Sequence, residues 1–217
     1  MEPLSLVSEP IDAYCKGHSS LPSRACEELA EFTRKNIPMS VMLSGPLVGS
    51  FLGILIKSIK AKRVLEVGCY TGYSALCMAE TLPEDGELIT LDINPEISPI
   101  TKRFWERSPH GKKIKLILGP AIESMNQLKP SFDLIFIDAD KANYTNYAKR
   151  SLELLSDCGL IVADNCLFQG EVLQPPNTMS DNAKGICQFN DFVHNHPDLE
   201  STLLPVRDGL HLVRRRP

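Results

Sequence analysis

The sequence lacks the features that mark several large classes of protein. No apolar run approaches the roughly 20 residues that a membrane-spanning helix needs. Residues 1–10 contain Glu2 and Glu9 and no basic stretch that leads into an apolar core, so no secretory signal peptide is predicted. The 7 cysteines include no C-x-x-C pair, which gives no sign of a zinc site or of a disulfide framework. We therefore expect a cytoplasmic protein with free thiols and no membrane partner.

An excess of positive charge is also missing. The formal net charge is -4, which argues against a protein built mainly to bind nucleic-acid phosphates. The run Arg214-Arg215-Arg216 is a local exception, and charge runs of this kind are usually solvated tails. No repeat and no Gly/Ser-rich linker interrupts the chain, and 217 residues suffice for a full hydrophobic core. We expect one domain over residues 1–217, with a helical region over 1–60 and an α/β core over 61–217.

Strand-like and helix-like segments alternate along most of the chain. Apolar runs typical of buried strands occupy residues 63–68, 88–93, 113–119, 132–139 and 159–165. Helical spacing of apolar residues is found at 22–37, 46–59, 73–82, 95–107, 121–128 and 143–155. Two short apolar runs, 201–206 and 210–214, flank Arg207-Asp208-Gly209, which is a good hairpin turn. The pattern predicts an α/β fold: a Rossmann-like, doubly wound, mostly parallel seven-stranded sheet with a C-terminal antiparallel hairpin and extra N-terminal helices.

The first predicted strand leads into a glycine loop, Gly68-Cys69-Tyr70-Thr71-Gly72. Its spacing fails the G-x-G-x-x-G pattern of dinucleotide-binding proteins at the second glycine. Glu66, inside the strand, would attract a cationic ligand such as a sulfonium or an amine, whereas an ordinary strand-to-helix turn would leave this carboxylate without a partner. Asp92 ends the second strand, where an acidic side chain can accept hydrogen bonds from the ribose of an adenosine-containing cofactor. The alternative for Asp92 is a helix N-cap.

Three oxygen-bearing side chains end two strands that should be neighbours in the sheet. Asp138 and Asp164 supply carboxylates and Asn165 supplies an amide oxygen, a set that suits Mg²⁺, with Mn²⁺ or Ca²⁺ as alternatives. The aspartates could instead be only turn formers, although their like charges would repel without a cation or a proton between them. Lys141 lies where its amine could reach the same edge as a base, and the alternative is a surface lysine paired with Asp140.

Together these motifs resemble the metal-dependent class I O-methyltransferases, the group that includes caffeoyl-CoA and catechol O-methyltransferases and their bacterial relatives. The resemblance extends from Met42 to the C-terminal hairpin. It rests on Ser44-Gly45-Pro46, the run from Glu66 to Ser74, Asp92-Ile93-Asn94, Gly119-Pro120-Ala121, Asp138-Ala139-Asp140-Lys141 with Asn143-Tyr144, and Asp164-Asn165. The chain departs from the family at Cys166-Leu167-Phe168-Gln169-Gly170 and before Met42, and both regions bear on the methyl acceptor.

The resemblance implies S-adenosylmethionine as the methyl donor. The family's cofactor-contact positions are occupied here by Ser44, Glu66, Gly68, Cys69, Ser74, Asp92, Ala121 and Asp138, and Tyr70 and Gly72 complete the predicted cofactor site. The resemblance places the metal ligands at Asp138, Asp164 and Asn165 and the catalytic base at Lys141. It implies a homodimer that methylates a hydroxyl of a small, catechol-like phenol with the help of a divalent cation.

Three other functions stay open at this point. Methylation of a hydroxylated uridine in tRNA is weakly favoured by Arg214-Arg215-Arg216 and Lys112-Lys113 and disfavoured by the acidic balance of charge. A nicotinamide-dependent dehydrogenase would share the fold but lacks G-x-G-x-x-G. A non-enzymatic binding module would leave the proposed metal ligands and Lys141 unexplained.

Overall fold

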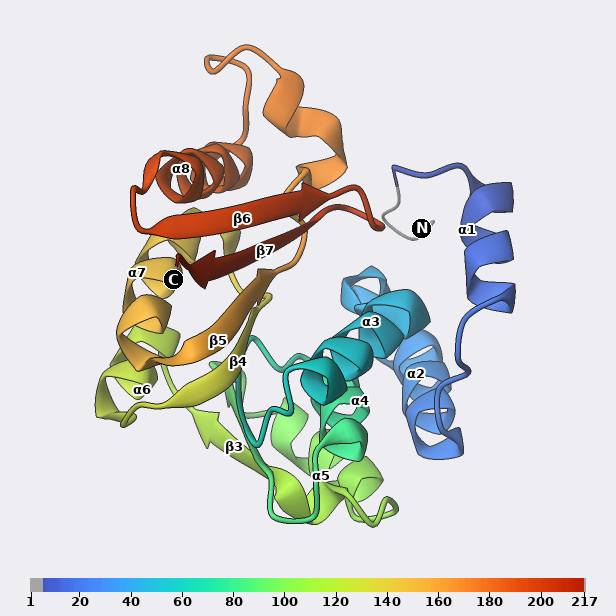
Figure 1. Ribbon diagram of the computed structural model, residues 1–217. Helices are drawn as coiled ribbons and strands as arrows, with labels where there is room; N and C mark the ends of the chain where they lie inside the picture. The colour runs from blue at the N-terminus through green and yellow to red at the C-terminus, as the bar shows by residue number, and fades with distance from the viewer. Residues whose placement is uncertain (1–5, 217) are drawn as a thin grey trace.

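The computed structural model describes residues 6–216 (Figure 1); residues 1–5, on which the signal-peptide expectation partly rests, and Pro217 lie outside the described residues. Within the described part, seven strands form one sheet in the order β3-β2-β1-β4-β5-β7-β6. The strands are β1 (Arg63–Val67), β2 (Glu87–Asp92), β3 (Ile114–Leu118), β4 (Phe132–Ile137), β5 (Leu155–Ala163), β6 (Leu199–Leu204) and β7 (Leu210–Arg215). The first five are parallel, whereas β7 runs antiparallel to both β5 and β6. The predicted fold class is confirmed.

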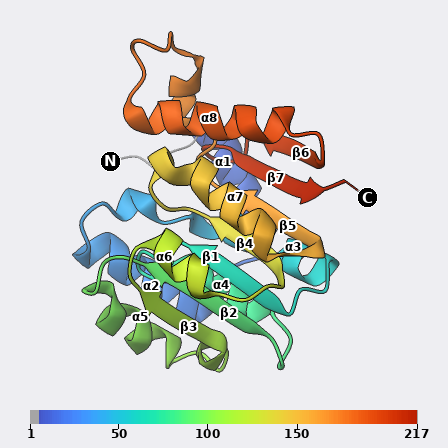
Figure 2. The ribbon, with the colours of Figure 1, turned by 90° about the vertical axis from the view of Figure 1, so that its left-hand side faces the viewer.

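Helices cover both faces of this sheet (Figures 1 and 2). One face carries α2 (Arg24–Asn36), α3 (Gly45–Ser58), α4 (Tyr73–Thr81) and α5 (Ile97–Trp105), with α1 (Glu9–Gly17) outside them; the other carries α6 (Ala121–Gln127), α7 (Tyr144–Leu154) and α8 (Asp181–Asn195). Short 3₁₀ turns lie at η1 (Ser40–Met42), η2 (Gly111–Lys113), η3 (Lys141–Asn143) and η4 (Phe168–Leu173). Such a two-sided sheet places the carboxyl ends of its parallel strands along one edge, where ligands bind in folds of this kind.

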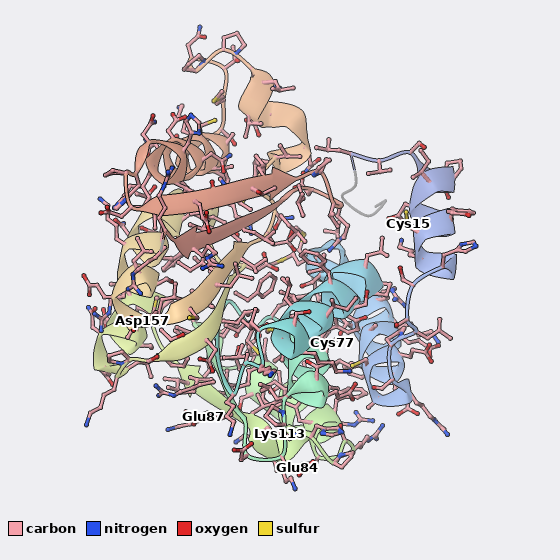
Figure 3. The ribbon with its side chains drawn as sticks, viewed as in Figure 1. Cys15, Cys77, Glu84, Glu87, Lys113 and Asp157 are labelled. Carbon is pink, nitrogen blue, oxygen red and sulfur yellow. The ribbon has the colours of Figure 1, made fainter. Side chains whose placement is uncertain are left out.

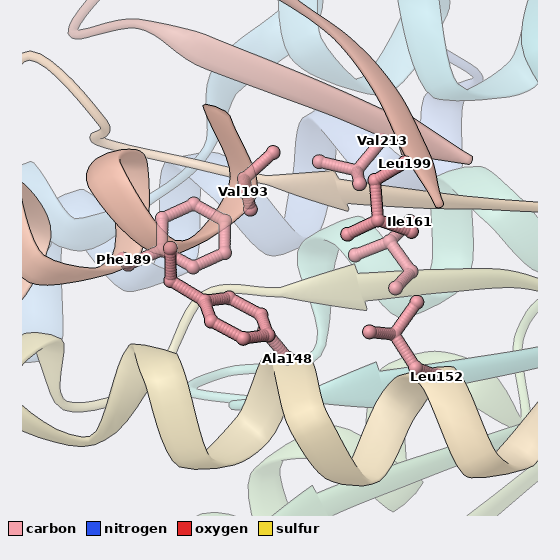
Figure 4. Close-up of a pocket in the computed structure, with 8 residues that line it drawn as sticks. Ala148, Leu152, Ile161, Phe189, Val193, Leu199 and Val213 are labelled. Carbon is pink, nitrogen blue, oxygen red and sulfur yellow. The ribbon is translucent and has the colours of Figure 1, made fainter. Parts of the chain in front are cut away.

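Successive residues of each central strand enter two separate hydrophobic cores. Val64 packs in the core beneath α3 and α4, whereas Leu65 packs in the core beneath α7 and α8. Figure 4 shows a recess in the second core, between α7, α8 and the sheet, lined by Ala148, Leu152, Ile161, Phe189, Phe192, Val193, Leu199 and Val213. The recess has no room for a water molecule, so these side chains form packing and not a ligand site.

One stretch of the described chain, Ser40–Ser58, is helical, long and apolar enough to cross a membrane by length and composition alone, which the sequence analysis did not anticipate. Most of this stretch is α3, which lies tightly against α4. A Cβ atom on Gly49 would lie 3.0 Å from the Sγ atom of Cys77. Leu52 and Ile56 are buried in the same core. Packing inside the protein therefore accounts for the apolar inner face of α3, whereas Ile54 is 60% exposed and 39% of the apolar stretch is buried.

Two expectations about the C-terminal part need correction. Arg214-Arg215-Arg216 is not a solvated tail, because Arg215 donates hydrogen bonds to carbonyl oxygens at the junction of α7 and β5, including that of Leu155 at 3.3 Å. Arg216 donates to the Leu199 carbonyl oxygen at 2.8 Å, and Arg214 pairs with Glu200. All three cations therefore have partners within the fold, and Arg214 and Arg216 are also exposed.

The second correction concerns α8, to which the sequence analysis assigned no helix. Ser180 caps this helix by accepting a hydrogen bond from the Ala183 amide at 3.2 Å. Phe189 and Val193 then bury the inner face of the helix in the second core. Polar residues interrupt the apolar pattern of α8, so tertiary packing and not local periodicity identifies it.

Candidate active site

The predicted site residues meet at the carboxyl edge of the parallel strands. The residue after each strand continues the hydrogen bonding to the neighbouring strand: the Gly68 amide donates to the Leu91 carbonyl oxygen at 3.0 Å, and the Asp138 amide donates to that of Val67 at 2.8 Å. The Asp164 amide donates in the same way to the carbonyl oxygen of Ile137 at 3.0 Å. Gly68, Asp138 and Asp164 therefore lie side by side at the ends of β1, β4 and β5.

Both glycines of the glycine loop are required by close packing. Gly68 and Gly72 have φ angles of 102° and 83°, a region that favours glycine. A Cβ atom on Gly68 would lie 2.2 Å from the Asp138 carbonyl oxygen, and one on Gly72 would lie 2.6 Å from the indole ring of Trp105. Trp105 also donates a hydrogen bond to the Gly72 carbonyl oxygen at 3.1 Å, so this indole helps to fix the loop.

Asp92 holds the other side of the glycine loop. Its Oδ2 atom accepts hydrogen bonds from the backbone amides of Cys69 and Tyr70 at 3.0 and 2.8 Å. Its Oδ1 atom accepts from the Asn94 amide at 2.9 Å, which forms a turn ahead of α5, whose N-cap is Glu96. Asp92 is therefore not the helix N-cap, and Oδ1 keeps a lone pair for a further donor such as a ribose hydroxyl.

Glu66 is a buried carboxyl group with one unsatisfied oxygen. The Thr90 hydroxyl donates to Oε2 at 2.5 Å, whereas Oε1 is buried and has no hydrogen-bond partner among the described residues. Burial raises the pKa of Glu66 to about 8, and the negative charges of Asp138 and Asp92 raise it further. The hydroxyls of Ser74 and Thr90 act in the opposite direction, because they favour the carboxylate. A buried acceptor without a partner in a protein interior is costly, and a cationic ligand would relieve that cost.

The remaining predicted cofactor residues surround the same edge from three helices. Ser44 is buried immediately before α3, Ser74 lies in the first turn of α4, and Ala121 begins α6. The Ser44 carbonyl oxygen accepts a hydrogen bond from the guanidinium of Arg207 in the β6–β7 turn. The C-terminal hairpin is therefore tied to the donor side of the site.

Asp138, Asp164 and Asn165 follow β4 and β5 directly and carry oxygen atoms of the kind that a hard divalent cation prefers. Asp164 is 1% exposed, and burial together with the charge of Asp138 raises the pKa of Asp164 to about 7, against the charges of Arg207 and Lys141. The two carboxylates thus repel each other, and a cation between them would remove the repulsion. No three His, Cys, Asp or Glu side chains are arranged to hold a metal ion within residues 6–216, so a cation here would also need the amide of Asn165 and water.

Lys141 is directed into this set and not toward solvent. Its Nζ atom donates to Asp138 Oδ1 at 2.8 Å and to the Tyr144 hydroxyl at 2.8 Å. Asp140, the alternative partner, instead accepts hydrogen bonds from the side chains of Tyr147 and Asn143. The structure therefore contradicts the surface-lysine alternative and places the amine beside the proposed metal ligands.

Sequence reasoning missed three residues that organise this site. Tyr144 is fully buried, and its hydroxyl bonds both Lys141 and the Asp164 carbonyl oxygen, the latter at 3.0 Å. Arg207 and Asp208 reach the site from the hairpin turn. Helical spacing from Lys141 was a signal for Tyr144, whereas Arg207 and Asp208 were recognised only as turn residues.

The fold and the donor-side residues together define a class I methyltransferase. The O-methyltransferase family model matches residues 16–216. Caffeoyl-CoA O-methyltransferase 1 of Eucalyptus globulus is 39% identical over 201 residues, which are 87% of this chain and 80% of that protein. The chain therefore belongs to the O-methyltransferase family, and it is an S-adenosylmethionine-dependent O-methyltransferase.

Solved structures agree with this assignment. The S-adenosylhomocysteine-bound methyltransferase PaMTH1 of Podospora anserina superposes with a TM-score of 0.89 at 31% identity, and the match covers 100% of both chains. The O-methyltransferase of Bacillus cereus, also in complex with S-adenosylhomocysteine, has a TM-score of 0.85 at 27% identity and covers 95% of this chain and 97% of its own.

Proposed function

We propose that this enzyme uses a divalent cation to methylate one hydroxyl of a small aromatic acceptor that carries two vicinal hydroxyls. The observation that carries the proposal is the meeting of two carboxylates, an amide and an amine at one edge of the sheet, at Asp138, Asp164, Asn165 and Lys141. The name of the plant relatives adds support, because a caffeoyl group is such a vicinal diol.

The donor would lie along the glycine loop. In this arrangement Glu66 faces the cationic part of S-adenosylmethionine, and Asp92 accepts hydrogen bonds from its ribose hydroxyls. Ser44, Ser74 and Ala121 would complete the donor site, together with the loop residues Gly68, Cys69, Tyr70 and Gly72, and Asp138 would lie between donor and cation. The buried acceptor of Glu66 then gains the partner that it lacks in the free protein.

Asp138, Asp164 and Asn165 would hold the cation, with Mg²⁺ the ion best matched to oxygen ligands. A bound divalent cation would stabilise negative charge on the acceptor oxygens, and it would replace the Lys141 ammonium as the partner of the Asp138 carboxylate. Lys141 would then release its ammonium proton to solvent, and the neutral Nζ would take the proton of one acceptor hydroxyl. The resulting oxyanion attacks the methyl carbon of the donor: a carbon–oxygen bond forms, the carbon–sulfur bond breaks, and S-adenosylhomocysteine leaves.

Asp164→Ala tests the cation and the donor separately. We expect turnover of a dihydroxycinnamate to be abolished, because one of two carboxylate ligands is lost, while S-adenosylhomocysteine binding measured by calorimetry stays close to wild type. A chelator should have the same effect on the wild-type enzyme, and Mg²⁺ should restore it. Asp157→Ala is the matched control, because Asp157 is exposed on β5 at the opposite end of the sheet (Figure 3). Full activity of Asp164→Ala in chelator would falsify the metal-dependent mechanism.

We also propose that the enzyme acts as a homodimer. α1 lies at the outside of the molecule and exposes the apolar side chains of Ile11 and Tyr14, which are 55% and 66% exposed. Apolar groups gathered on one helix are typical of an interface between subunits. Light scattering at micromolar protein should give the mass of two chains, and the mass of one chain would contradict the proposal.

A further inference from the structure

The turn between β6 and β7 is hydrogen-bonded to the segment that carries Asn165. The Cys166 amide donates to the Gly209 carbonyl oxygen at 3.0 Å, and the Leu167 amide donates to that of Asp208 at 2.9 Å. The Asp208 side chain adds two further contacts: Oδ1 accepts from the Gln169 amide at 2.5 Å, and Oδ2 accepts from Asn165 Nδ2 at 3.3 Å. A turn some 40 residues away in the sequence thus holds the chain immediately after Asp164.

Asp208 is buried, with 1% of its surface exposed, and each of its oxygens has a separate donor. A carboxylate only accepts hydrogen bonds, so the amide of Asn165 must present its NH₂ group to Asp208. The carbonyl oxygen of Asn165 is on the other side of the same planar amide and therefore points away from Asp208. Without this contact the side-chain amide of Asn165 could turn over and present NH₂ in place of oxygen.

We infer that Asp208 is a positioning residue of the proposed metal site, which sets the amide of Asn165 so that its oxygen and not its nitrogen faces the cation. The inference rests on the proposed function, because Asn165 needs a fixed orientation only if it is a ligand. Partners that orient metal ligands commonly change metal affinity by about 10- to 100-fold when they are removed.

Asp208→Asn tests the inference with almost no change of shape. The introduced amide has one oxygen for two donors. If that oxygen accepts from the backbone N–H of Gln169, the introduced NH₂ group faces Asn165, and the amide of Asn165 must turn over to present its oxygen. If the oxygen instead accepts from Asn165, the introduced NH₂ group faces the backbone N–H of Gln169, and two donors oppose each other. We expect the dissociation constant for Mn²⁺ to rise about tenfold or more.

Loss of a nearby negative charge would also weaken Mn²⁺ binding, so the effect of Asp208→Asn is measured again in an Asn165→Ala background. Alanine has no amide to orient, whereas the charge of Asp208 acts on the cation as before. If Asp208 sets orientation, Asp208→Asn costs about threefold or less in this background. If Asp208 acts only through its charge, the cost is the same in both backgrounds.

The measurement is calorimetric titration of the full-length protein with Mn²⁺ in the presence of S-adenosylhomocysteine, with melting temperature in chelator as a check of folding. Asp157→Asn, which removes a distant exposed carboxylate, should leave Mn²⁺ affinity unchanged. If wild type does not bind Mn²⁺, the proposed metal site fails and the inference fails with it. If wild type binds and Asp208→Asn binds equally well, or if the two backgrounds show equal costs, the inference is overturned while the metal site stands.

If Asp208→Asn alone does not fold, the two proteins that carry Asn165→Ala decide the question. A loss of Mn²⁺ affinity of about tenfold or more on adding Asp208→Asn to that background overturns the inference, and a loss of about threefold or less supports it.

Discussion

At the scale of single residues, Lys141 is held by contacts on both sides of its own segment. Asp138 lies three residues before it and Tyr144 three residues after it, and both are 2.8 Å from Nζ. The amine also lies over the Tyr144 ring, 4.9 Å from its centre. These contacts hold a long, flexible side chain in one position. A base needs such a fixed position if it is to meet one particular hydroxyl.

Tyr144→Phe should therefore slow turnover without abolishing it. The ring and its contact with the amine remain, but the hydroxyl that bonds Lys141 and the Asp164 carbonyl oxygen is lost. We expect kcat to fall about five- to tenfold, in keeping with the loss of the one hydrogen bond to the amine, against roughly a hundredfold or more for Lys141→Ala. Steady-state kinetics and donor binding would be measured, and donor affinity should be unchanged.

Raising the pH should partly rescue Lys141→Ala, since the acceptor can then ionise without a base.

Tyr147→Phe is the matched control for this comparison, because Tyr147 lies on α7 with Tyr144 but its hydroxyl bonds Asp140 and not Lys141. Equal losses of kcat in Tyr144→Phe and Tyr147→Phe would show that the Tyr144 hydroxyl has no particular role in placing the amine.

At the scale of secondary-structure elements, α8 sets the position of the segment that carries Lys141. Gly185 is the point of closest approach between them. A Cβ atom on Gly185 would lie 2.5 Å from the Lys141 carbonyl oxygen and 2.7 Å from Ala142 Cα. Because these are backbone atoms, a side chain at this position forces either α8 or η3 to move.

Gly185→Ala should thus displace the proposed base through a single methyl group. We expect kcat to fall about tenfold or more, since small displacements of reacting groups carry large costs, while calorimetric donor affinity stays near wild type because the donor residues lie on other elements. The matched control is Gly17→Ala in α1, where nothing lies within 4 Å of the added atom and alanine favours the helix. Unchanged kcat in Gly185→Ala would mean that α8 does not position Lys141.

At the scale of the whole molecule, the carboxyl edge of the sheet concentrates buried acidic groups. The pKa of Glu66 is raised to about 8 and that of Asp164 to about 7, in both cases chiefly by burial. The pKa of His211, on β7, is lowered by burial to about 4. Ligand binding and folding stability are therefore linked to pH through these groups.

The free energy of unfolding of the ligand-free enzyme should fall as the pH rises through 7 and 8. Glu66 and Asp164 keep a proton in the folded state at pH values where the unfolded chain has lost it, so their contribution is complete below the ordinary pKa values of 4.5 and 3.8, declines as the pH rises above them, and is fully lost once the pH passes each raised pKa. His211 changes stability in the opposite direction with pH. Because its pKa is lowered in the folded state, the free energy of unfolding decreases as the pH falls from 6.5 toward 4, and His211 has no effect above pH 6.5.

Denaturant unfolding between about pH 6.5 and 8.5 checks this prediction. Glu66→Gln, which is neutral at every pH, should show a shallower decline than wild type, whereas Glu106→Gln, at an exposed position, should follow wild type. Mn²⁺ and S-adenosylmethionine together should flatten the wild-type decline, because positive ligands favour the ionised carboxylates. A ligand-free stability that is constant or rises over this range would contradict the assigned pKa shifts.

Local sequence was sufficient for the fold and for the edge at which the site lies. Each central strand is an apolar run, because both faces of the sheet are covered, and each ends abruptly in glycine or a carboxylate. That pattern placed Gly68, Asp138 and Asp164 at strand ends and made the strands of Asp138 and Asp164 neighbours, whereas the pairing of β1 with β4 comes from the structure. The prediction failed at α8, where the apolar pattern is weak. It also failed at Arg214-Arg215-Arg216, because a run of charges alone does not distinguish a strand end from a free tail.

The sequence by itself determined the doubly wound sheet and which side chains stand at its carboxyl edge, since hydrophobic periodicity and turn residues act over a few neighbouring positions. Only the tertiary structure decided which of those side chains meet. It paired Lys141 with Asp138 and not with the adjacent Asp140, and it brought Asp208 to Asn165 from the far end of the hairpin. Contacts between residues distant in the sequence depend on how whole elements pack, and such packing leaves no periodic trace in the chain.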